Sequence, residues 1–281
     1  MKRVGAALWG EASPVSHLFG RLQRTARGIA RAVRRRLFHR RRFDVCCCGL
    51  SKTGTHSMAG IFENYRSAHH PDAGTRLPLA IGYLKGEVDA GVAERTLRSR
   101  DRHLYLEMES SSLAGILIEP LLKAWPEKRF ILTIRGLYAW CDSWIDHNIN
   151  SPPEAASLFG TLDQIRLRVG DFPATRFDSP LTERGFPPLP CYFQLWASHN
   201  TRVLEAVPPR RLLIVQTEQL SDRFADIARW VGVPPQTLRL DRGQLFTTPK
   251  KHRVLATLDA SYVRDTAERF CTPLLEPYLT G

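Results

Sequence analysis

A short apolar run, a glycine-containing loop and a helix start follow one another directly in this sequence. Residues 45–48 are short enough for a buried strand, and residues 58–63 continue as a helix. Between them, Gly49 and Gly54 flank a polar loop that carries Lys52. Such a unit is an anion-binding cradle, because backbone N–H groups at a helix start point at one place, with the positive end of the helix dipole behind them. The candidate contacts are Ser51, Lys52, Thr53, Gly54, Thr55, His56 and Ser57.

The loop differs from the nucleotide-binding loop of kinases and ATPases. That loop reads Gly-x-x-x-x-Gly-Lys-Ser/Thr, with the lysine directly after the second glycine. Here Lys52 stands two residues before Gly54. A plain strand-to-helix connection can have the same composition, so the functional reading needs a second motif.

A second candidate phosphate site follows residues 128–134, which predict a central strand of a parallel sheet. Arg135 stands at the end of this segment, and Ser143 comes eight residues later on a predicted helix. A guanidinium offers a fork of N–H donors and a hydroxyl adds one more, so the pair can bind a phosphate. The alternative for Arg135 is a salt bridge at the strand end.

Acidic residues mark a third predicted strand, residues 102–109, where apolar and polar side chains alternate. Glu107 and Glu109 would lie near its carboxyl end, where ligands gather in open α/β sheets. The alternative is a solvated edge face. The preceding stretch predicts a helix over residues 87–98 and a surface turn at residues 69–74, and its two histidines have no partners at metal-ligand spacing.

The second half of the chain continues the α/β pattern. Helices are predicted over residues 113–125, 191–206, 222–230 and 260–275, and a further parallel strand over residues 211–216. Between two of these helices, the proline-rich residues 146–190 predict an insertion, which we expect to shape an acceptor site. A late basic loop holds Lys250, Lys251 and Arg253.

Taken together, these motifs resemble the bacterial-type sulfotransferases that use PAPS (3′-phosphoadenosine 5′-phosphosulfate). The resemblance covers residues 43–281 and implies an α/β three-layer sandwich with a central parallel sheet, similar to P-loop NTPases. It implies that the cradle binds the 5′-phosphosulfate and that Arg135 and Ser143 bind the 3′-phosphate. The late basic loop would close over the 3′-phosphate and adenine. The implied donor product is 3′,5′-adenosine bisphosphate, and no metal is implied.

The sequence departs from the family pattern at several positions. Gly136 and Leu137 stand where aspartate and proline usually follow the arginine, and Ser57 replaces a tryptophan that stacks on adenine. The usual catalytic histidine has no counterpart after residues 102–109. For the base that takes the acceptor proton we expect Glu109, then Glu107. The competing candidates are His56 and His103.

The resemblance predicts in-line transfer of a sulfuryl group to a hydroxyl or amine, with Lys52 neutralising charge on the leaving phosphate oxygen. The acceptor class stays open between a small molecule, a glycan and a lipid. Two alternative functions also stay open. One is an ATP-dependent kinase on a related fold, and the other is a non-catalytic membrane-associated module.

The basic residues are concentrated in a leader. Residues 1–42 hold twelve Lys or Arg and one Glu, which gives +11 of the chain's net charge of +12. Within residues 15–38, apolar residues recur every three or four positions among arginines, which predicts a basic amphipathic helix able to lie on an anionic membrane. No aromatic residues alternate with the arginines, so we expect no nucleic acid. Six cysteines without a disulfide pattern favour a reducing, cytoplasmic location, with peripheral membrane association as the alternative.

Overall fold

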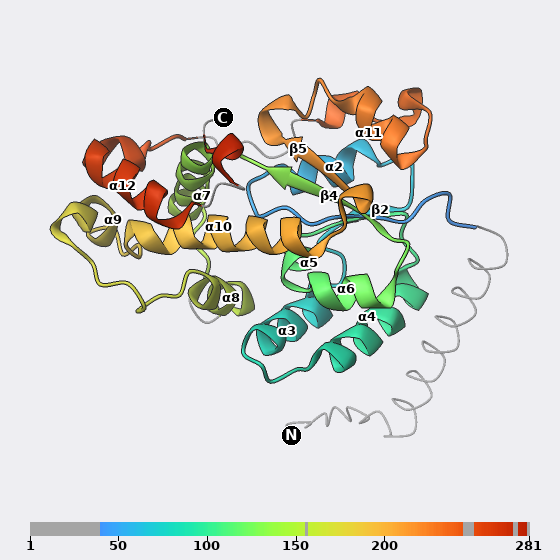
Figure 1. The fold of residues 1–281 in the computed structure, drawn as a ribbon, viewed down its shortest axis with the longest axis horizontal. Helices are drawn as coiled ribbons and strands as arrows, with labels where there is room; N and C mark the ends of the chain where they lie inside the picture. Colours follow the sequence, from blue (N-terminus) through green and yellow to red (C-terminus); the bar gives the residue numbers. More distant parts are fainter. Residues whose placement is uncertain (1–39, 155–156, 244–249, 272–274, 280–281) are drawn as a thin grey trace, which may run out of the picture.

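The computed structural model describes residues 40–154, 157–243, 250–271 and 275–279. Its centre is a five-stranded sheet with the strand order β2-β3-β1-β4-β5, and every neighbouring pair is parallel (Figure 1). The carboxyl ends of all five strands therefore share one edge of the sheet. The strands are β1 (Val45–Cys47), β2 (Ser67–His69), β3 (Met108–Ser110), β4 (Arg129–Ile134) and β5 (Leu212–Gln216).

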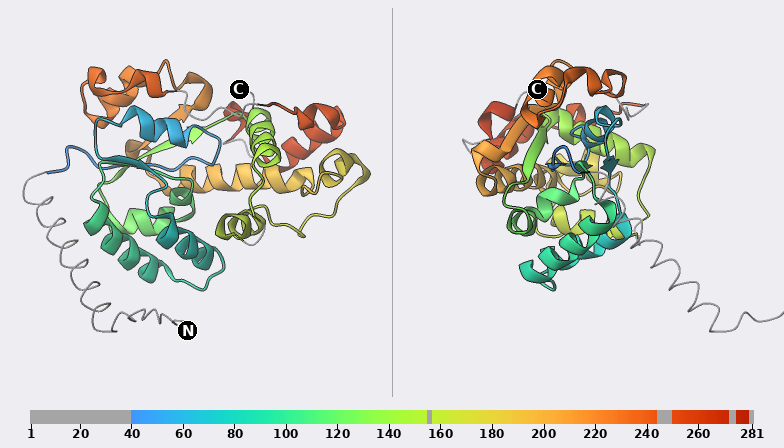
Figure 2. Two further views of the ribbon diagram at one scale, coloured as in Figure 1. Left: turned by 180° about the vertical axis from the view of Figure 1, so that it is seen from behind. Right: turned by 90° about the vertical axis from the view of Figure 1, so that its right-hand side faces the viewer.

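Two hydrophobic cores cover the two faces of the sheet. Val45 and Cys47 pack with Met58 of α2 (Thr55–Ile61) and Ile227 of α11 (Phe224–Val231). Cys46 and Cys48 point to the opposite core, because side chains alternate along a strand. That second core is built on α3 (Ala73–Leu84), α4 (Ala90–Leu104), α5 (Leu113–Ile116), α6 (Ile118–Ala124) and α10 (Leu189–Ala206). Figures 1 and 2 show the sheet between these layers, which confirms the predicted α/β sandwich.

A group of helices extends beyond the end of the sheet at which β4 terminates (Figures 1 and 2). It comprises α7 (Leu137–Asn150), α8 (Leu158–Arg166), α9 (Ser179–Thr182), the first half of α10, and α12 (Ala260–Phe270). The predicted insertion at residues 146–190 supplies the end of α7 and all of α8 and α9. Within this group, α8 packs on α3, and α12 packs on α10.

Short 3₁₀ helices connect the larger elements. They are η1 (Arg176–Asp178), η2 (Pro209–Arg211), η3 (Thr217–Gln219), η4 (Pro235–Thr237), η5 (Leu240–Arg242), η6 (Val254–Thr257) and η7 (Glu276–Tyr278). The three predicted strands at 45–48, 128–134 and 211–216 are confirmed as β1, β4 and β5. The predicted helices at 58–63, 191–206 and 222–230 are confirmed as α2, α10 and α11, with ends shifted by a few residues.

The strand predicted at residues 102–109 is wrong over most of its length. Helix α4 continues through Leu104, and Tyr105 then reverses the chain with φ 48° before the three-residue β3. The buried residues Ala93, Leu97 and Arg100 show the helical spacing of four and three that extends into this segment. The apparent alternation therefore belongs to the last turn of a helix and the connection that follows it.

Two other predictions need correction, and one strand was not predicted. Residues 67–69 form the edge strand β2, paired with β3; the predicted turn follows it at residues 70–72, and α3 begins at Ala73. The helix predicted over residues 113–125 is divided at Leu117 into α5 and α6. Helix α12 ends at Phe270, and residues 272–274 of its predicted last turn lie outside the described residues.

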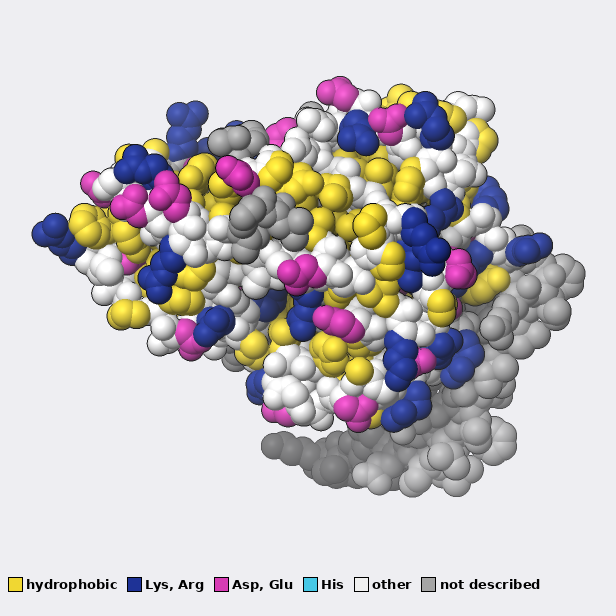
Figure 3. Space-filling view, viewed as in Figure 1, with side chains coloured by type: hydrophobic (Ala, Val, Ile, Leu, Met, Phe, Trp, Pro, Cys, Tyr) yellow, Lys and Arg dark blue, Asp and Glu magenta, His cyan; other side chains and the backbone are white. Residues whose placement is uncertain are grey.

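The predicted amphipathic leader lies outside the described residues except for its last three positions. There, Arg41 forms an ion pair with Asp101, and Arg42 pairs with Glu107, so this end of the leader lies against α4 and the connection to β3. On the face that Figure 3 shows, basic and acidic side chains are mixed. Within the described residues, each helix is too short or too polar to span a lipid bilayer.

Candidate active site

A cavity of ≈ 1040 Å³ lies at the carboxyl edge of the sheet. Its wall combines the loop after β1, the end of β4, helices α7 and α8, the segment after β5, and the late basic loop. The predicted site residues in this wall are Ser51, Lys52, Gly54, Thr55, His56, Ser57, Arg135, Ser143, Lys251 and Arg253. Two motifs separated by about eighty residues in sequence thus converge on one cavity.

The loop between β1 and α2 has an unusual backbone. Gly54 precedes α2 with φ 89°, in the left-handed region that glycine adopts at little cost. Lys52 has φ 71°, which a non-glycine residue rarely adopts. Such strain persists only where the surroundings enforce it, and it is concentrated at functional sites. The loop is therefore a β1–turn–α2 unit of the P-loop-like kind, with its lysine held in one backbone conformation.

Buried polar contacts fix this loop from three sides. The indole Nε1 of Trp140 in α7 donates to the Ser51 carbonyl at 2.9 Å, and the Thr217 hydroxyl donates to the Thr53 carbonyl at 2.8 Å. The side chain of Thr53 is fully buried and bonds Leu50 and Thr133, each at 2.8 Å. Thr53 was predicted as a cofactor contact, but its side chain shapes the loop and does not line the cavity.

Arg135 is positioned at the end of β4 by a second buried tryptophan. The indole Nε1 of Trp196 donates to the Arg135 carbonyl at 2.9 Å. The guanidinium reaches back to the cradle, where Nη1 lies 3.5 Å from the Lys52 carbonyl, and its Nε lies 3.7 Å from the Glu218 carboxylate. Lys52 and Arg135 therefore face one space from adjacent strands, and their charges interact.

This proximity has an electrostatic consequence. Burial and the neighbouring Arg135 lower the pKa of Lys52, whereas Asp146 acts in the opposite direction. Two like charges held this close are stabilised by an anion that binds between them. The cavity is therefore electrostatically suited to a polyanionic ligand.

Helix α7 also anchors the late basic loop. Asp146 accepts from the His252 backbone N–H at 2.7 Å, and Asp142 accepts from that of Leu255 at 3.1 Å. These contacts bring Lys251 and Arg253 into the cavity wall. Lys250, also predicted as a contact, is exposed and does not line the cavity.

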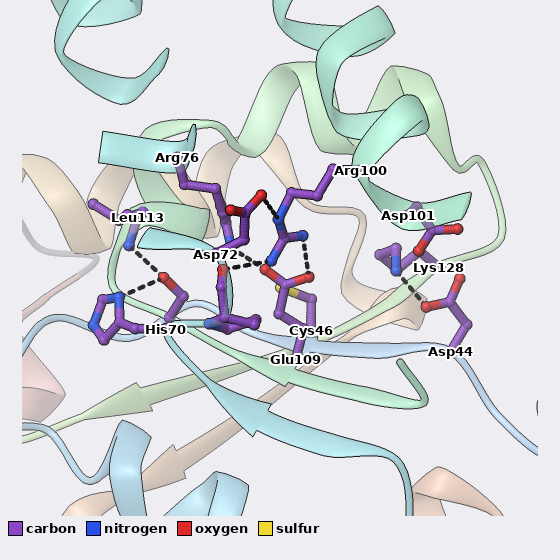
Figure 4. A network of polar contacts seen from close by, with 12 residues as sticks. Asp44, Cys46, His70, Asp72, Arg76, Arg100, Asp101, Glu109, Leu113 and Lys128 are labelled. Atoms are coloured by element: carbon purple, nitrogen blue, oxygen red, sulfur yellow. Dashed lines mark hydrogen bonds and ion pairs between the residues drawn. The ribbon is translucent and has the colours of Figure 1, made fainter. Parts of the chain in front are cut away.

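The structure places Glu109 away from the cavity, against our expectation of a base. Its carboxylate forms ion pairs with Arg76 of α3 and Arg100 of α4 (Figure 4). Burial alone would raise the pKa of Glu109, but the two guanidinium groups outweigh this effect and hold the pKa at about 2. A carboxylate held in this way is a structural anion, because it binds a proton only in strong acid.

Glu107 and His103, the other outlying base candidates, lie elsewhere too. Glu107 precedes β3, is 1% exposed, and pairs with Arg42 and Arg66. Burial alone would raise the pKa of Glu107. Hydrogen bonds from Arg42 and Arg66 have a larger, opposite effect, so the pKa of Glu107 is lowered overall. His103 is exposed on α4, with Nδ1 2.9 Å from the Ser99 carbonyl. None of the three is among the described residues that line the cavity.

Four of the described histidines line the cavity, and three of them, His56, His69 and His70, form a cluster, while His147 belongs to α7. His56 stacks on His69 with ring centroids 4.7 Å apart, and His69 meets His70 edge-on at 4.4 Å. His70 Nδ1 lies 3.0 Å from the Ser111 hydroxyl, and its Nε2 lies 3.4 Å from that of Ser112. His56 was predicted as a contact from the sequence, whereas His69 and His70 were predicted to lie in a surface turn.

Of these rings, His69 and His70 are held neutral. Burial and the neighbouring His70 lower the pKa of His69 to about 3, and burial and Arg76 lower that of His70 to about 4. A neutral imidazole carries one unprotonated nitrogen that can accept a hydrogen bond or a proton, although these low pKa values make both rings weaker proton acceptors than an ordinary histidine. Among the described residues, no group of three or more His, Cys, Asp or Glu side chains is arranged to hold a metal ion.

A comparison with protein families identifies the class. The family model described as "Sulfotransferase domain" matches residues 44–236, which is more than half of the chain. The chain therefore belongs to the sulfotransferase domain family and is a transferase of that family.

Solved structures with similar folds include two bacterial-type members. A sulfotransferase from Alicyclobacillus acidocaldarius is 14% identical, with a TM-score of 0.45, and the match covers 82% of this chain and 94% of that one. A sulfotransferase domain from the curacin biosynthetic pathway is 12% identical, with a TM-score of 0.43, covering 83% and 93%. In a comparison with curated proteins, none matches this chain.

Proposed function

We propose that this protein transfers a sulfuryl group from PAPS to a hydroxyl or amine of an acceptor bound in the same cavity. Lys52, Arg135 and Ser143 line one space, and this convergence supports the proposal. Lys52 and Arg135 follow different strands, β1 and β4, and a ligand with phosphates at both the 5′ and 3′ positions offers one anion to each residue.

In the proposed complex, the cradle and Lys52 hold the 5′-phosphosulfate, while Arg135 and Ser143 hold the 3′-phosphate. Arg135 would exchange its 3.7 Å contact with Glu218 for the phosphate oxygens. A guanidinium binds an oxyanion through parallel N–H bonds, so this exchange favours the ligand. Lys251 and Arg253 add positive charge on the same side.

The base we propose is His70, in place of Glu109 and Glu107. Its Nε2 faces the hydroxyl of Ser112, which accepts a hydrogen bond from Ser51 of the cradle at 3.2 Å. Ser112 therefore links the His70 imidazole to the cradle. The acceptor oxygen would bond to sulfur as the bridging S–O bond breaks, and its proton would move to His70. The electron pair would remain on the 5′-phosphate oxygen, where Lys52 offsets the charge.

The donor assignment is tested by nucleotide titration. We expect 3′,5′-adenosine bisphosphate to bind more tightly than 5′-AMP, which lacks only the 3′-phosphate. Arg135→Ala should weaken binding of the bisphosphate about 10- to 100-fold and leave 5′-AMP nearly unchanged, because a hydrogen bond to a charged group contributes about 1.5–3 kcal/mol. Isothermal titration calorimetry measures both ligands.

Arg264→Ala is the control, because Arg264 is exposed and pairs only weakly with Asp265 at 3.6 Å, away from the cavity. Tighter binding of ATP with magnesium would support the kinase alternative instead. Absence of any nucleotide binding would support the non-catalytic module. Equal affinity for the bisphosphate and 5′-AMP would remove Arg135 from the proposed role.

A further inference from the structure

Helix α8 turns one face toward the cavity. Phe159, Leu162, Asp163 and Arg166 all line it, and their spacing of three, one and three residues places them on a single side of a helix. These residues come from the segment predicted to shape the acceptor site. The face is apolar at its first turn and charged at its last.

This face lies across the cavity from the proposed donor contacts. Arg135 follows β4, on one side of β1, whereas α8 packs on α3, which follows β2 on the other side. The Phe159 ring meets the His70 ring edge-on, with centroids 6.1 Å apart, which places the start of α8 next to the proposed base. An acceptor that reaches His70 therefore extends along α8.

Arg166 stands at the end of this face and is poorly neutralised. It is 9% exposed, its carbonyl accepts from Gln194 at 2.7 Å, and its Nη2 is buried with no hydrogen-bond partner among the described residues. No carboxylate of the described residues forms an ion pair with it. Asp163, three residues earlier on the same helix, interacts electrostatically with Arg166 and favours its charge, but burial raises the pKa of that carboxyl and the two groups make no direct ion pair. A buried guanidinium in this state is unfavourable unless an anion pairs with it.

We propose that Arg166 binds an anionic group of the acceptor. The acceptor is then a hydroxyl-bearing compound with an oxyanion, such as a carboxylate, separated from the reacting oxygen by an apolar portion that contacts Phe159 and Leu162. This inference rests on the proposed function, because it concerns the second substrate of the same cavity. It narrows the acceptor class, since a neutral lipid or neutral glycan would leave Arg166 unpaired.

Two probes that differ only in charge test the inference. 4-Hydroxyphenylacetate and its methyl ester are titrated separately into the protein saturated with 3′,5′-adenosine bisphosphate. We expect the acid to bind at least 10-fold more tightly than the ester. Arg166→Gln should abolish this preference, and Arg166→Lys should retain part of it, because lysine keeps the charge but loses the planar fork.

Arg168→Gln is the matched control, since Arg168 loses the same charge but is exposed and bonds Asp171 at 2.6 Å, outside the cavity wall. It should keep the wild-type preference. If Arg166→Gln does not fold, Arg166→Lys provides the test. Its preference for the acid over the ester should then be several-fold smaller than that of the wild type.

Equal affinity for acid and ester in the wild type, including no measurable binding of either, overturns the inference. So does a preference that survives in Arg166→Gln. Affinity for 3′,5′-adenosine bisphosphate should be unchanged in Arg166→Gln, which separates the two proposals. If the bisphosphate does not bind at all, the donor assignment fails, and the same acid–ester comparison on the nucleotide-free protein still decides the role of Arg166.

Discussion

Lys52 shows how individual residues are placed for function at some cost in stability. Its backbone occupies a left-handed conformation that costs on the order of 1–3 kcal/mol for a residue other than glycine. The Arg135 guanidinium lies against its carbonyl, and buried contacts from Trp140 and Thr217 hold the residues on either side. The rigid loop, and not the conformational preference of a lysine, therefore sets the direction of the Lys52 side chain.

We expect substitutions of His70 and His56 to have different effects on kcat, because both residues line the cavity but contact different partners. His70→Gln should lower kcat for sulfate transfer about 100-fold or more, since general base catalysis contributes about 10²–10⁴-fold. It should change the affinity for 3′,5′-adenosine bisphosphate little. His56→Gln should keep kcat within a few-fold. Release of labelled sulfate product from PAPS measures both variants.

The opposite ranking, with the large loss in His56→Gln, would move the base to the helix start. A large loss of nucleotide affinity in His70→Gln would instead make His70 a donor contact.

The roles of single residues were predictable only where a local pattern carried them. Lys52, Arg135 and Ser143 follow apolar runs at recognisable distances, and the cavity wall contains all three. Glu109 could not be read in the same way, because the arginines that bind it come from α3 and α4, at 33 and 9 residues' separation. Arg166 also depends on the fold, since only the packing of α8 on α3 brings it to the cavity.

At the scale of elements, the turn after β1 needs a glycine at its first position. A Cβ on Gly49 would lie 2.0 Å from Thr133 Oγ1, 2.5 Å from Thr53 Oγ1 and 2.6 Å from the Thr133 carbonyl. Strand β4 therefore passes directly against the start of the cradle, and both strands must shift to admit a methyl group.

Gly49→Ala should accordingly lower the free energy of unfolding by about 1–3 kcal/mol, as overpacking does in a rigid interior. It should also weaken binding of 3′,5′-adenosine bisphosphate. Urea denaturation and calorimetry measure the two effects. Gly74→Ala in α3 is the control, because a Cβ there meets nothing within 4 Å and should not destabilise the protein. Unchanged stability in Gly49→Ala would show that β4 can move away from residue 49 at little cost in free energy.

Apolar runs explain which strands were predictable. Strands β4 and β5 are long apolar runs, and the three-residue β1 lies in a continuous apolar run followed by a glycine-containing loop, whereas the three-residue β2 and β3 show neither an apolar run nor a complete alternation. Strands β2 and β3 form because β3 pairs with β1 and β2 pairs with β3. The roles of His69, the last residue of β2, and His70, which follows it, were missed for that reason.

Across the whole molecule, buried neutral histidines should make stability depend on pH. His199 donates Nε2–H to the Cys48 carbonyl at 2.9 Å, and burial together with Arg166 lowers the pKa of His199 to about 3. The unfolded chain binds that proton near pH 6.5. The unfolded state therefore gains protons first as pH falls, and folded-state stability decreases from about pH 6.5 downward.

Between pH 7 and pH 5, His199 should contribute about 2 kcal/mol of lost stability, and His69 and His70 act in the same direction. Glu107 and Glu109 do not contribute to the change in stability between pH 7 and pH 5, because they lose their stabilising charge only below their ordinary pKa near 4.5. Urea denaturation at several pH values should show a smaller slope in His199→Gln than in wild type. His103→Gln, on the exposed surface, is the control. An unchanged slope in His199→Gln would assign the effect to other groups.

Trp140 and Trp196 give the molecule a built-in optical signal. Each indole donates a hydrogen bond to a backbone carbonyl of a segment that lines the cavity, Trp140 to Ser51 and Trp196 to Arg135, and both rings are buried. Indole emission is sensitive to such contacts, so filling of the cleft can be followed by intrinsic fluorescence. Compound collections can be screened in this way without a label and before any acceptor has been identified.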